Sequence, residues 1–139
     1  MLLLDTHVLV WVDEGNPRLG REATQTINKA LASGQLGVAS ISFWEIAMLV
    51  RKNLLVRKNR LDIQIELDVW RRELLQNGLL EIPLQGSTAL RAGQLRTFHG
   101  DPADRMIVAT ALEYPATLVT ADNKILDWGG LHQKIDASL

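Results

Sequence analysis

The sequence contains no cysteine and only three histidines, so two common kinds of site are missing. A chain without thiols forms no disulfide bonds and offers no thiolate ligands to zinc. His7, His99 and His132 lie far apart, and no two of them have the spacing that places histidine ligands on one face of a helix. The absence of cysteine fits a reducing compartment, and we expect a cytoplasmic protein. If a metal binds, carboxylates should hold it, which favours Mg²⁺ or Mn²⁺.

Long hydrophobic runs and a basic leader are missing as well. The first residues, MLLLDTHVLV, contain no Lys or Arg, and Asp5 and His7 interrupt their apolar run. No apolar stretch is long enough to span a bilayer, so we expect no membrane association. With 139 residues, of which 47% are hydrophobic, the chain should fold as one domain over residues 1–139 with a core of its own.

Short apolar segments alternate along the chain with helical patterns. We expect strands at residues 2–5, 36–39, 79–84 and 117–120, with 134–137 as a candidate fifth. Helices are expected at residues 6–14, 21–32, 40–53, 63–76, 87–98, 103–113 and 123–126, and residues 54–61 fit neither pattern. In the helix at 87–98, Leu90, Leu95 and Phe98 should face inward. This alternation predicts an α/β domain with a mainly parallel central sheet of about four or five strands, flanked by helices on both faces.

Acidic residues follow several of these strands. Asp5 ends the first strand, Glu45 lies early in the helix after the second, and Asp122 closely follows the fourth. Because parallel α/β sheets bind ligands outside the carboxyl ends of their strands, these acids should lie close together. Asp101 and Asp104 begin a helix that follows another helix, so topology alone does not place them at this edge.

Each acid also has a simpler explanation when it is taken alone. Asp5, Asp101 and Asp122 stand where N-cap residues stand, and Ser42 with Glu45 matches a capping box. A cap stabilises a helix by roughly 1 kcal/mol. Two carboxylates about 4 Å apart, however, repel each other by roughly 4 kcal/mol at an effective dielectric near 20. If the fold brings the acids together, capping does not account for the arrangement, whereas a divalent cation does.

Four segments have a recognisable order and separation. They are LLLDTHVLVW at the start, SISFWEIAML near residue 45, HGDPADRMIVATA at 99–111 and LVTADNKI at 118–125. Together they resemble the PIN-domain family, and within it the small VapC-type toxin ribonucleases of toxin–antitoxin pairs. The resemblance covers nearly the whole chain. It implies a single PIN-like nuclease domain that cleaves RNA at an acidic Mg²⁺ or Mn²⁺ site, forms a homodimer and binds a cognate antitoxin.

The resemblance also implies roles for particular residues. The catalytic acids would be Asp5, Glu45, Asp104 and Asp122. Asp5 and Asp104 would hold the metal, and Asp101, Asp122 and Glu45 are further candidate ligands. Thr6 and Thr120 match hydroxyl positions beside the acids, where they would orient carboxylates or a water.

The net charge of −1 conceals a division between acids and bases. If the five acids of the predicted site are set aside, the remaining 11 acids face 15 Lys and Arg, which leaves +4 on the rest of the chain. An acidic pocket in a mildly basic surface suits a phosphodiester substrate. The candidates for RNA contact are Arg51, Lys52, Arg57, Lys58 and, beside the site, Arg105. A solvated charge run, and an ion pair of Arg105 with Asp101, would explain these residues equally well.

Two other classes of function stay open from the residues alone. A phosphoacceptor receiver domain also gathers aspartates at strand ends, but it needs an Asp after a central strand, and Gln85 and Gly86 follow the third strand here. A non-catalytic module that binds protein or RNA is the other class. The helices that carry Trp11, Trp44 and residues 48–50 are apolar on more than one side, which suits a partner or a second copy of the chain.

Overall fold

A five-stranded parallel sheet forms the centre of the computed structural model, which describes residues 1–52 and 63–139, with side chains from residue 66 onward in the second range. The strands are β1 (Leu2–Leu4), β2 (Leu36–Ala39), β3 (Leu80–Ile82), β4 (Thr117–Thr120) and β5 (Lys134–Asp136). Their order is β3-β2-β1-β4-β5, and every neighbouring pair is parallel. The predicted parallel sheet, including its fifth strand, is confirmed, and β1 lies at its middle.

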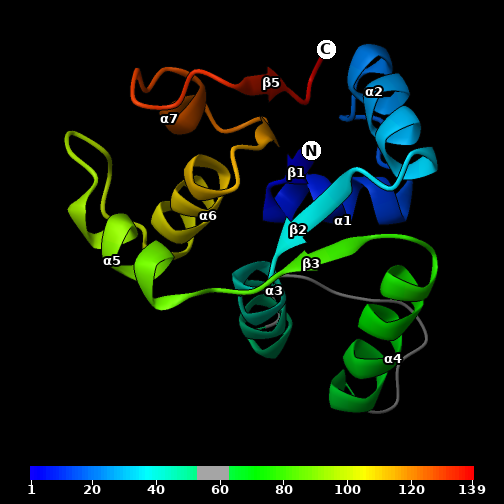
Figure 1. The fold of residues 1–139 in the computed structure, drawn as a ribbon. Helices are drawn as coiled ribbons and strands as arrows, with labels where there is room; N and C mark the ends of the chain where they lie inside the picture. Colours follow the sequence, from blue (N-terminus) through cyan, green and yellow to red (C-terminus); the bar gives the residue numbers. More distant parts are fainter. Residues whose placement is uncertain (53–62) are drawn as a thin grey trace.

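Helices cover both faces of this sheet (Figure 1). They are α1 (Thr6–Glu14), α2 (Arg21–Ala32), α3 (Ile41–Arg51), α4 (Ile63–Gln76), α5 (Gly86–Gln94), α6 (Pro102–Glu113) and α7 (Asn123–Leu126). Consecutive strand residues point to opposite faces, so Leu2 and Leu4 pack with the α1–α4 layer while Leu3 packs with the α5–α7 layer. Among the described residues, no helix has the length and apolar character needed to cross a membrane.

The helix expected at residues 87–98 is shorter than predicted. It begins at Gly86 and ends at Gln94, and Leu90, expected to face inward, is 66% exposed. Leu95 and Phe98 do pack against the α5–α7 core, but from the connection that follows the helix. In that connection Thr97 has a φ of 56°, outside the helical region, so the chain turns away before the apolar spacing has run out.

Candidate active site

Asp5 lies at the carboxyl end of the central strand and is only 2% exposed. It is the N-cap of α1, where its Oδ1 accepts a hydrogen bond from the backbone N–H of Thr6 at 2.8 Å. Its Oδ2 accepts a hydrogen bond from the hydroxyl of Thr120 at 2.7 Å. Both carboxylate oxygens are therefore held by donors, one from its own helix and one from the neighbouring strand β4.

The two threonines occupy different places in this arrangement. Thr120 donates to Asp5, and its Oγ1 also accepts from the backbone N–H of Asp122 at 3.1 Å, so it connects two of the predicted site acids. Thr6 donates from its hydroxyl to Ser42 Oγ at 2.9 Å. The capping box predicted for Ser42 is wrong, because α3 begins at Ile41 after the N-cap Ser40 and the hydroxyl of Ser42 faces Thr6 instead.

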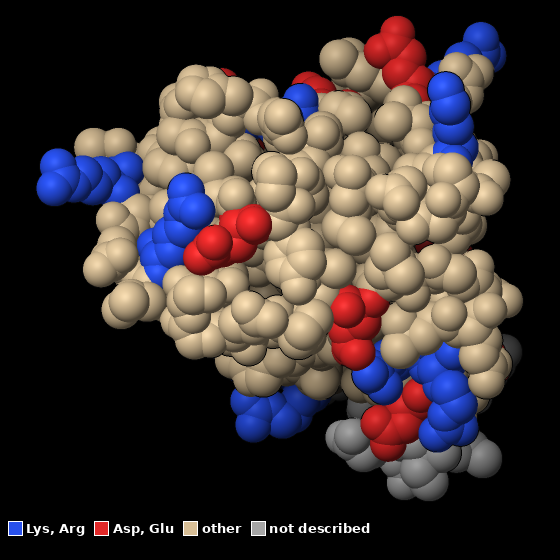
Figure 2. Space-filling model, in the orientation of Figure 1, with Lys and Arg blue, Asp and Glu red and all other residues tan. Residues whose placement is uncertain are grey.

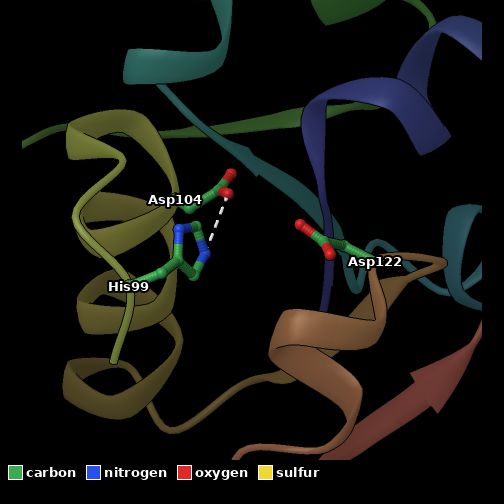
Figure 3. A group of neighbouring side chains, drawn as sticks. All are labelled: His99, Asp104 and Asp122. Carbon is green, nitrogen blue, oxygen red and sulfur yellow. Dashed lines mark ion pairs between the residues drawn. The ribbon is translucent and has the colours of Figure 1, made fainter. Parts of the chain in front are cut away.

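Asp101 and Asp104 share the start of α6. Asp101 is the N-cap, and its Oδ1 accepts from the backbone N–H of Asp104 at 3.2 Å, while Pro102 occupies the first helical position. The capping interpretation is thus confirmed for Asp101. Asp104 points out of the helix toward His99 and Asp122, as Figure 3 shows, and its side chain is 16% exposed.

Two overlapping groups of side chains could hold a cation. The ligand atoms of His99, Asp104 and Asp122 lie within 4.8 Å of one another, and so do those of Glu45, Asp101 and Asp104. Asp104 belongs to both groups. Asp5 belongs to neither, but it lines a pocket of about 250 Å³ together with Glu45 and Asp104. The structure therefore brings all five predicted acids to one edge of the sheet, with Asp104 between the others.

The electrostatics of the site follow from this crowding. Burial, together with the charges of Asp5, Asp101, Asp122 and Glu45, raises the pKa of Asp104 to about 7. Burial also raises the pKa of Glu45, with Asp5 and Asp101 adding to the effect, whereas Thr6 and His7 oppose it. Uncompensated like charges of this kind favour either proton uptake or a bound cation.

The spacing between the three histidines did not indicate that two of them, His7 and His99, lie at the site. His99 Nδ1 accepts from the backbone N–H of Asp101 at 3.4 Å, so the proton of the neutral ring is on Nε2, which lies 3.2 Å from Asp104 Oδ2. That nitrogen is buried and lacks the geometry of a hydrogen bond to any described residue. In the sequence, only the short distance from His99 to Asp101 indicated that His99 lies at the site.

His7 has a parallel arrangement at the other core aspartate. Its Nε2 accepts from the backbone N–H of Ala121 at 3.0 Å, which leaves the proton on Nδ1, 3.6 Å from Asp5 Oδ2. Both Asp5 and Asp104 thus face an imidazole N–H whose tautomer is fixed by a backbone amide. Such outer partners orient carboxylates in metal sites.

Arg105 does not have the position that a phosphate-binding residue would need. Its guanidinium donates to five backbone carbonyl oxygens, and these five contacts use all the N–H groups that an arginine has. The predicted phosphate contact and the alternative ion pair with Asp101 are both inconsistent with this geometry. Arg51 and Lys52 are exposed at the end of α3, and Arg57 and Lys58 lie outside the described residues.

The donor set suits a hard divalent cation. Carboxylate oxygens are the ligands that Mg²⁺ and Mn²⁺ prefer, and Asp104 has four further carboxylates close enough to raise its pKa. Fold and site together define a parallel α/β domain with an acidic pocket at the carboxyl edge of its sheet. Residues 2–130 match the PIN domain family, and the chain belongs to that family.

Known proteins similar to the chain support this assignment. The chain is 35% identical over 125 residues to Ribonuclease VapC22 of Mycobacterium tuberculosis, an alignment that covers 89% of this chain and 88% of that relative. Its fold matches VapBC2 from Rickettsia felis bound to a promoter DNA fragment, with a TM-score of 0.68 and 22% identity over 97% and 98% of the two chains. A toxin–antitoxin complex from Klebsiella pneumoniae matches with a TM-score of 0.63 and 21% identity over 99% and 98%.

Proposed function

We propose that this protein is a metal-dependent endoribonuclease that acts as the toxin of a toxin–antitoxin pair. The observation that carries the proposal is the convergence of four other carboxylates around that of Asp104, which capping cannot explain. The 35% identical relative is named a ribonuclease, and the structure from Klebsiella pneumoniae with the same fold is described as a toxin–antitoxin complex. RNA is therefore the substrate class, and Mg²⁺ or Mn²⁺ is the cofactor.

Asp104 and Asp5 would hold the cation, with Glu45, Asp101 and Asp122 as the remaining candidates. When bound, the cation would stabilise charge on the attacked phosphate and lower the pKa of a water. Thr120 fixes the orientation of Asp5 through the hydrogen bond to its Oδ2. Glu45, whose pKa is raised by burial, lines the same pocket and would accept a proton from the attacking water at its carboxylate.

The same protein would bind a cognate antitoxin and a second copy of itself in the cytoplasm. Trp44 on α3 is 52% exposed, and Leu90 on α5 is 66% exposed, so apolar surface is left on two separate helices. Tryptophan is among the residues enriched in protein contacts. A purely binding role, without catalysis, is the second candidate, and these same residues favour it.

Cleavage of RNA by the purified protein tests the catalytic proposal. End-labelled structured RNA is incubated with the protein and Mn²⁺ or Mg²⁺, and internal cuts are read by electrophoresis. We expect cleavage that EDTA abolishes and that Asp5→Asn and Asp104→Asn each reduce at least 100-fold. Asp127→Asn, at an exposed position outside the pocket, is the matched control. Equal cleavage by the wild type and both pocket variants would leave only the binding role.

A further inference from the structure

Arg105 links two elements that meet at the proposed active site. It follows Asp104 in the first turn of α6, and its side chain runs back to the end of α5. Nε donates to the carbonyl oxygen of Ala92 at 2.9 Å, and Nη2 donates to those of Leu95 at 2.8 Å and Gly93 at 3.4 Å. The last carbonyls of a helix have no partner within it, so Arg105 caps α5 from another helix. Its positive charge also suits the negative end of the helix dipole.

The remaining donors of Arg105 hold the connection between α5 and α6. Nη1 donates to the carbonyl oxygens of Phe98 and His99, both at 3.1 Å. A sixth carbonyl in this stretch, that of Arg96, accepts from Trp128 Nε1 at 3.2 Å. Four carbonyls of the connection are therefore bound by Arg105 or Trp128, and that of Arg96 also accepts from the hydroxyl of Thr97 at 2.6 Å.

This connection contains a strained residue. Thr97 has a φ of 56°, which is uncommon for any residue other than glycine and unfavourable for a β-branched one. Such conformations persist only where the surrounding structure holds them in place. The carbonyls on either side of Thr97, those of Arg96 and Phe98, are the ones bound by Trp128 and Arg105.

The strained connection leads directly into the acidic pocket. His99, two residues beyond Thr97, packs against Phe98 with ring centroids 4.4 Å apart and ring planes tilted by 50°, and its Nε2 lies 3.2 Å from Asp104 Oδ2. We propose that Arg105 is a positioning residue, which fixes the Leu95–His99 connection so that His99 Nε2 stays beside the Asp104 carboxylate, 3.2 Å from its Oδ2. The first turn of α6 thus supplies both Asp104 and Arg105, and the side chain of Arg105 holds the connection that carries His99. The inference rests on the proposed function of the pocket, and its test separates the two.

Hydrogen exchange of the full chain tests the structural half of the inference. Arg105→Lys keeps the charge but has a single nitrogen, which cannot reach five carbonyls. We expect the amides of residues 93–101 to exchange at least tenfold faster, with β1 and β4 unchanged. Arg91→Lys is the matched control, since Arg91 is exposed on α5 and lies 3.7 Å from Glu113. Unchanged exchange at 93–101 would overturn the inference whether or not the protein cleaves RNA.

A double-mutant cycle with His99 tests the functional half. Arg105→Lys should lower kcat for RNA cleavage at least tenfold and leave KM within twofold, and it should add no further loss in a His99→Ala background. Independent effects that multiply, or a rise in KM alone, would show that Arg105 does not act through His99. If the wild type fails to cleave RNA, only the proposed function is contradicted, and the same double-mutant cycle is then measured as Mn²⁺ affinity by calorimetry.

If Arg105→Lys does not fold, Trp128→Phe replaces it, because this substitution removes the donor to the Arg96 carbonyl and loosens the same connection. The same non-additivity with His99→Ala is expected.

Discussion

Asp104 lies in the first turn of α6, where a carboxylate favours the helix, and among four other acids, which disfavour its charge. Burial and these neighbouring acids together outweigh the effect of the helix, since the pKa of Asp104 rises to about 7. Because the folded carboxyl binds its proton more tightly than the unfolded one, whose pKa is near 3.8, ionisation of Asp104 destabilises the metal-free fold. This destabilisation appears as the pH rises from about 4 and is complete just above 7.

Asp104→Asn should therefore stabilise the protein in EDTA in a pH-dependent way. We expect no gain in melting temperature at pH 4, a growing gain up to pH 7, and a constant gain of roughly 5 °C or more at pH 8. Thermal unfolding followed by circular dichroism measures it. Asp127→Asn, at an exposed position outside the pocket, should give the same melting temperature as the wild type throughout. A pH-independent difference for Asp104→Asn would contradict the assignment.

Thr120 is a fully buried hydroxyl that both donates to Asp5 and accepts from the backbone of Asp122. Thr120→Val preserves the shape of the side chain but leaves both groups without this partner. We expect a loss of about 1–3 kcal/mol in the free energy of unfolding and a fall in RNA cleavage of about 10- to 100-fold. Urea unfolding and the cleavage assay measure the two effects. Thr117→Val, at the partly buried start of the same strand, should change neither by a comparable amount.

At the scale of the elements, local patterns predicted most helix starts and strands correctly. Where they failed, contacts from elsewhere in the chain decided the outcome. The apolar spacing continued to Phe98, yet α5 ends at Gln94, because Arg105 from α6 binds its last carbonyls. The Ser42 hydroxyl, which fitted a capping box, instead accepts a hydrogen bond from Thr6 of α1. Both partners, Arg105 and Thr6, lie outside the segments whose patterns predicted these features.

The start of α2 depends on residues 137–139 in a similar way. The backbone N–H of Gly20 donates to the carbonyl of Ala137 at 2.9 Å, and that of Glu22 donates to Leu139 O at 2.8 Å. A Cβ on Gly20 would lie 2.2 Å from backbone atoms of Leu139. This close approach explains why a residue without a side chain stands at the N-cap.

Gly20→Ala should therefore push residues 137–139 off α2. We expect a loss of about 1–3 kcal/mol in the free energy of unfolding, measured by urea denaturation. Gly86→Ala is the matched control, because a Cβ at this first residue of α5 meets nothing within 4 Å. It should leave stability unchanged or raise it by up to about 1 kcal/mol. Equal effects of the two substitutions would contradict the packing explanation.

At the scale of the whole molecule, charge is not segregated on the face shown in Figure 2. Acidic and basic side chains are scattered there, often next to each other, with no large patch of one sign. This face therefore offers RNA no extended basic surface, and contact with RNA there would depend on particular basic residues. Arg51 and Lys52 at the end of α3, the helix that also carries Glu45, are the exposed candidates among the described residues.

Reversing both charges tests their role in RNA binding. Arg51→Glu with Lys52→Glu should weaken binding and reduce the slope of log K against log salt by on the order of one unit, since each phosphate contact on a single strand contributes about 0.7. Filter binding in EDTA measures the slope without cleavage. Arg21→Glu with Lys29→Glu on α2 makes the same change in net charge elsewhere and should leave the slope nearly unchanged. An equal slope in both variants would exclude Arg51 and Lys52 from the RNA contact.

The acids of the candidate site could be predicted from the sequence, but the histidines and backbone groups that surround them could not. Strand order places Asp5, Glu45 and Asp122 at one edge, and this follows from alternating strands and helices. The tautomers of His7 and His99 depend on single backbone amides, those of Ala121 and Asp101, whose directions no pattern in the sequence encodes. The same holds for the carbonyls that bind Arg105.

The sheet order has a further consequence for the time at which the pocket comes into existence. β1 emerges first during synthesis, yet its neighbour β4 and the hydroxyl of Thr120 that holds Asp5 are made more than a hundred residues later. Until β4 pairs with β1, Asp5 lacks that donor and Asp122 is not yet present. A nascent chain on the ribosome therefore carries no complete pocket until β4 has been made and has paired with β1.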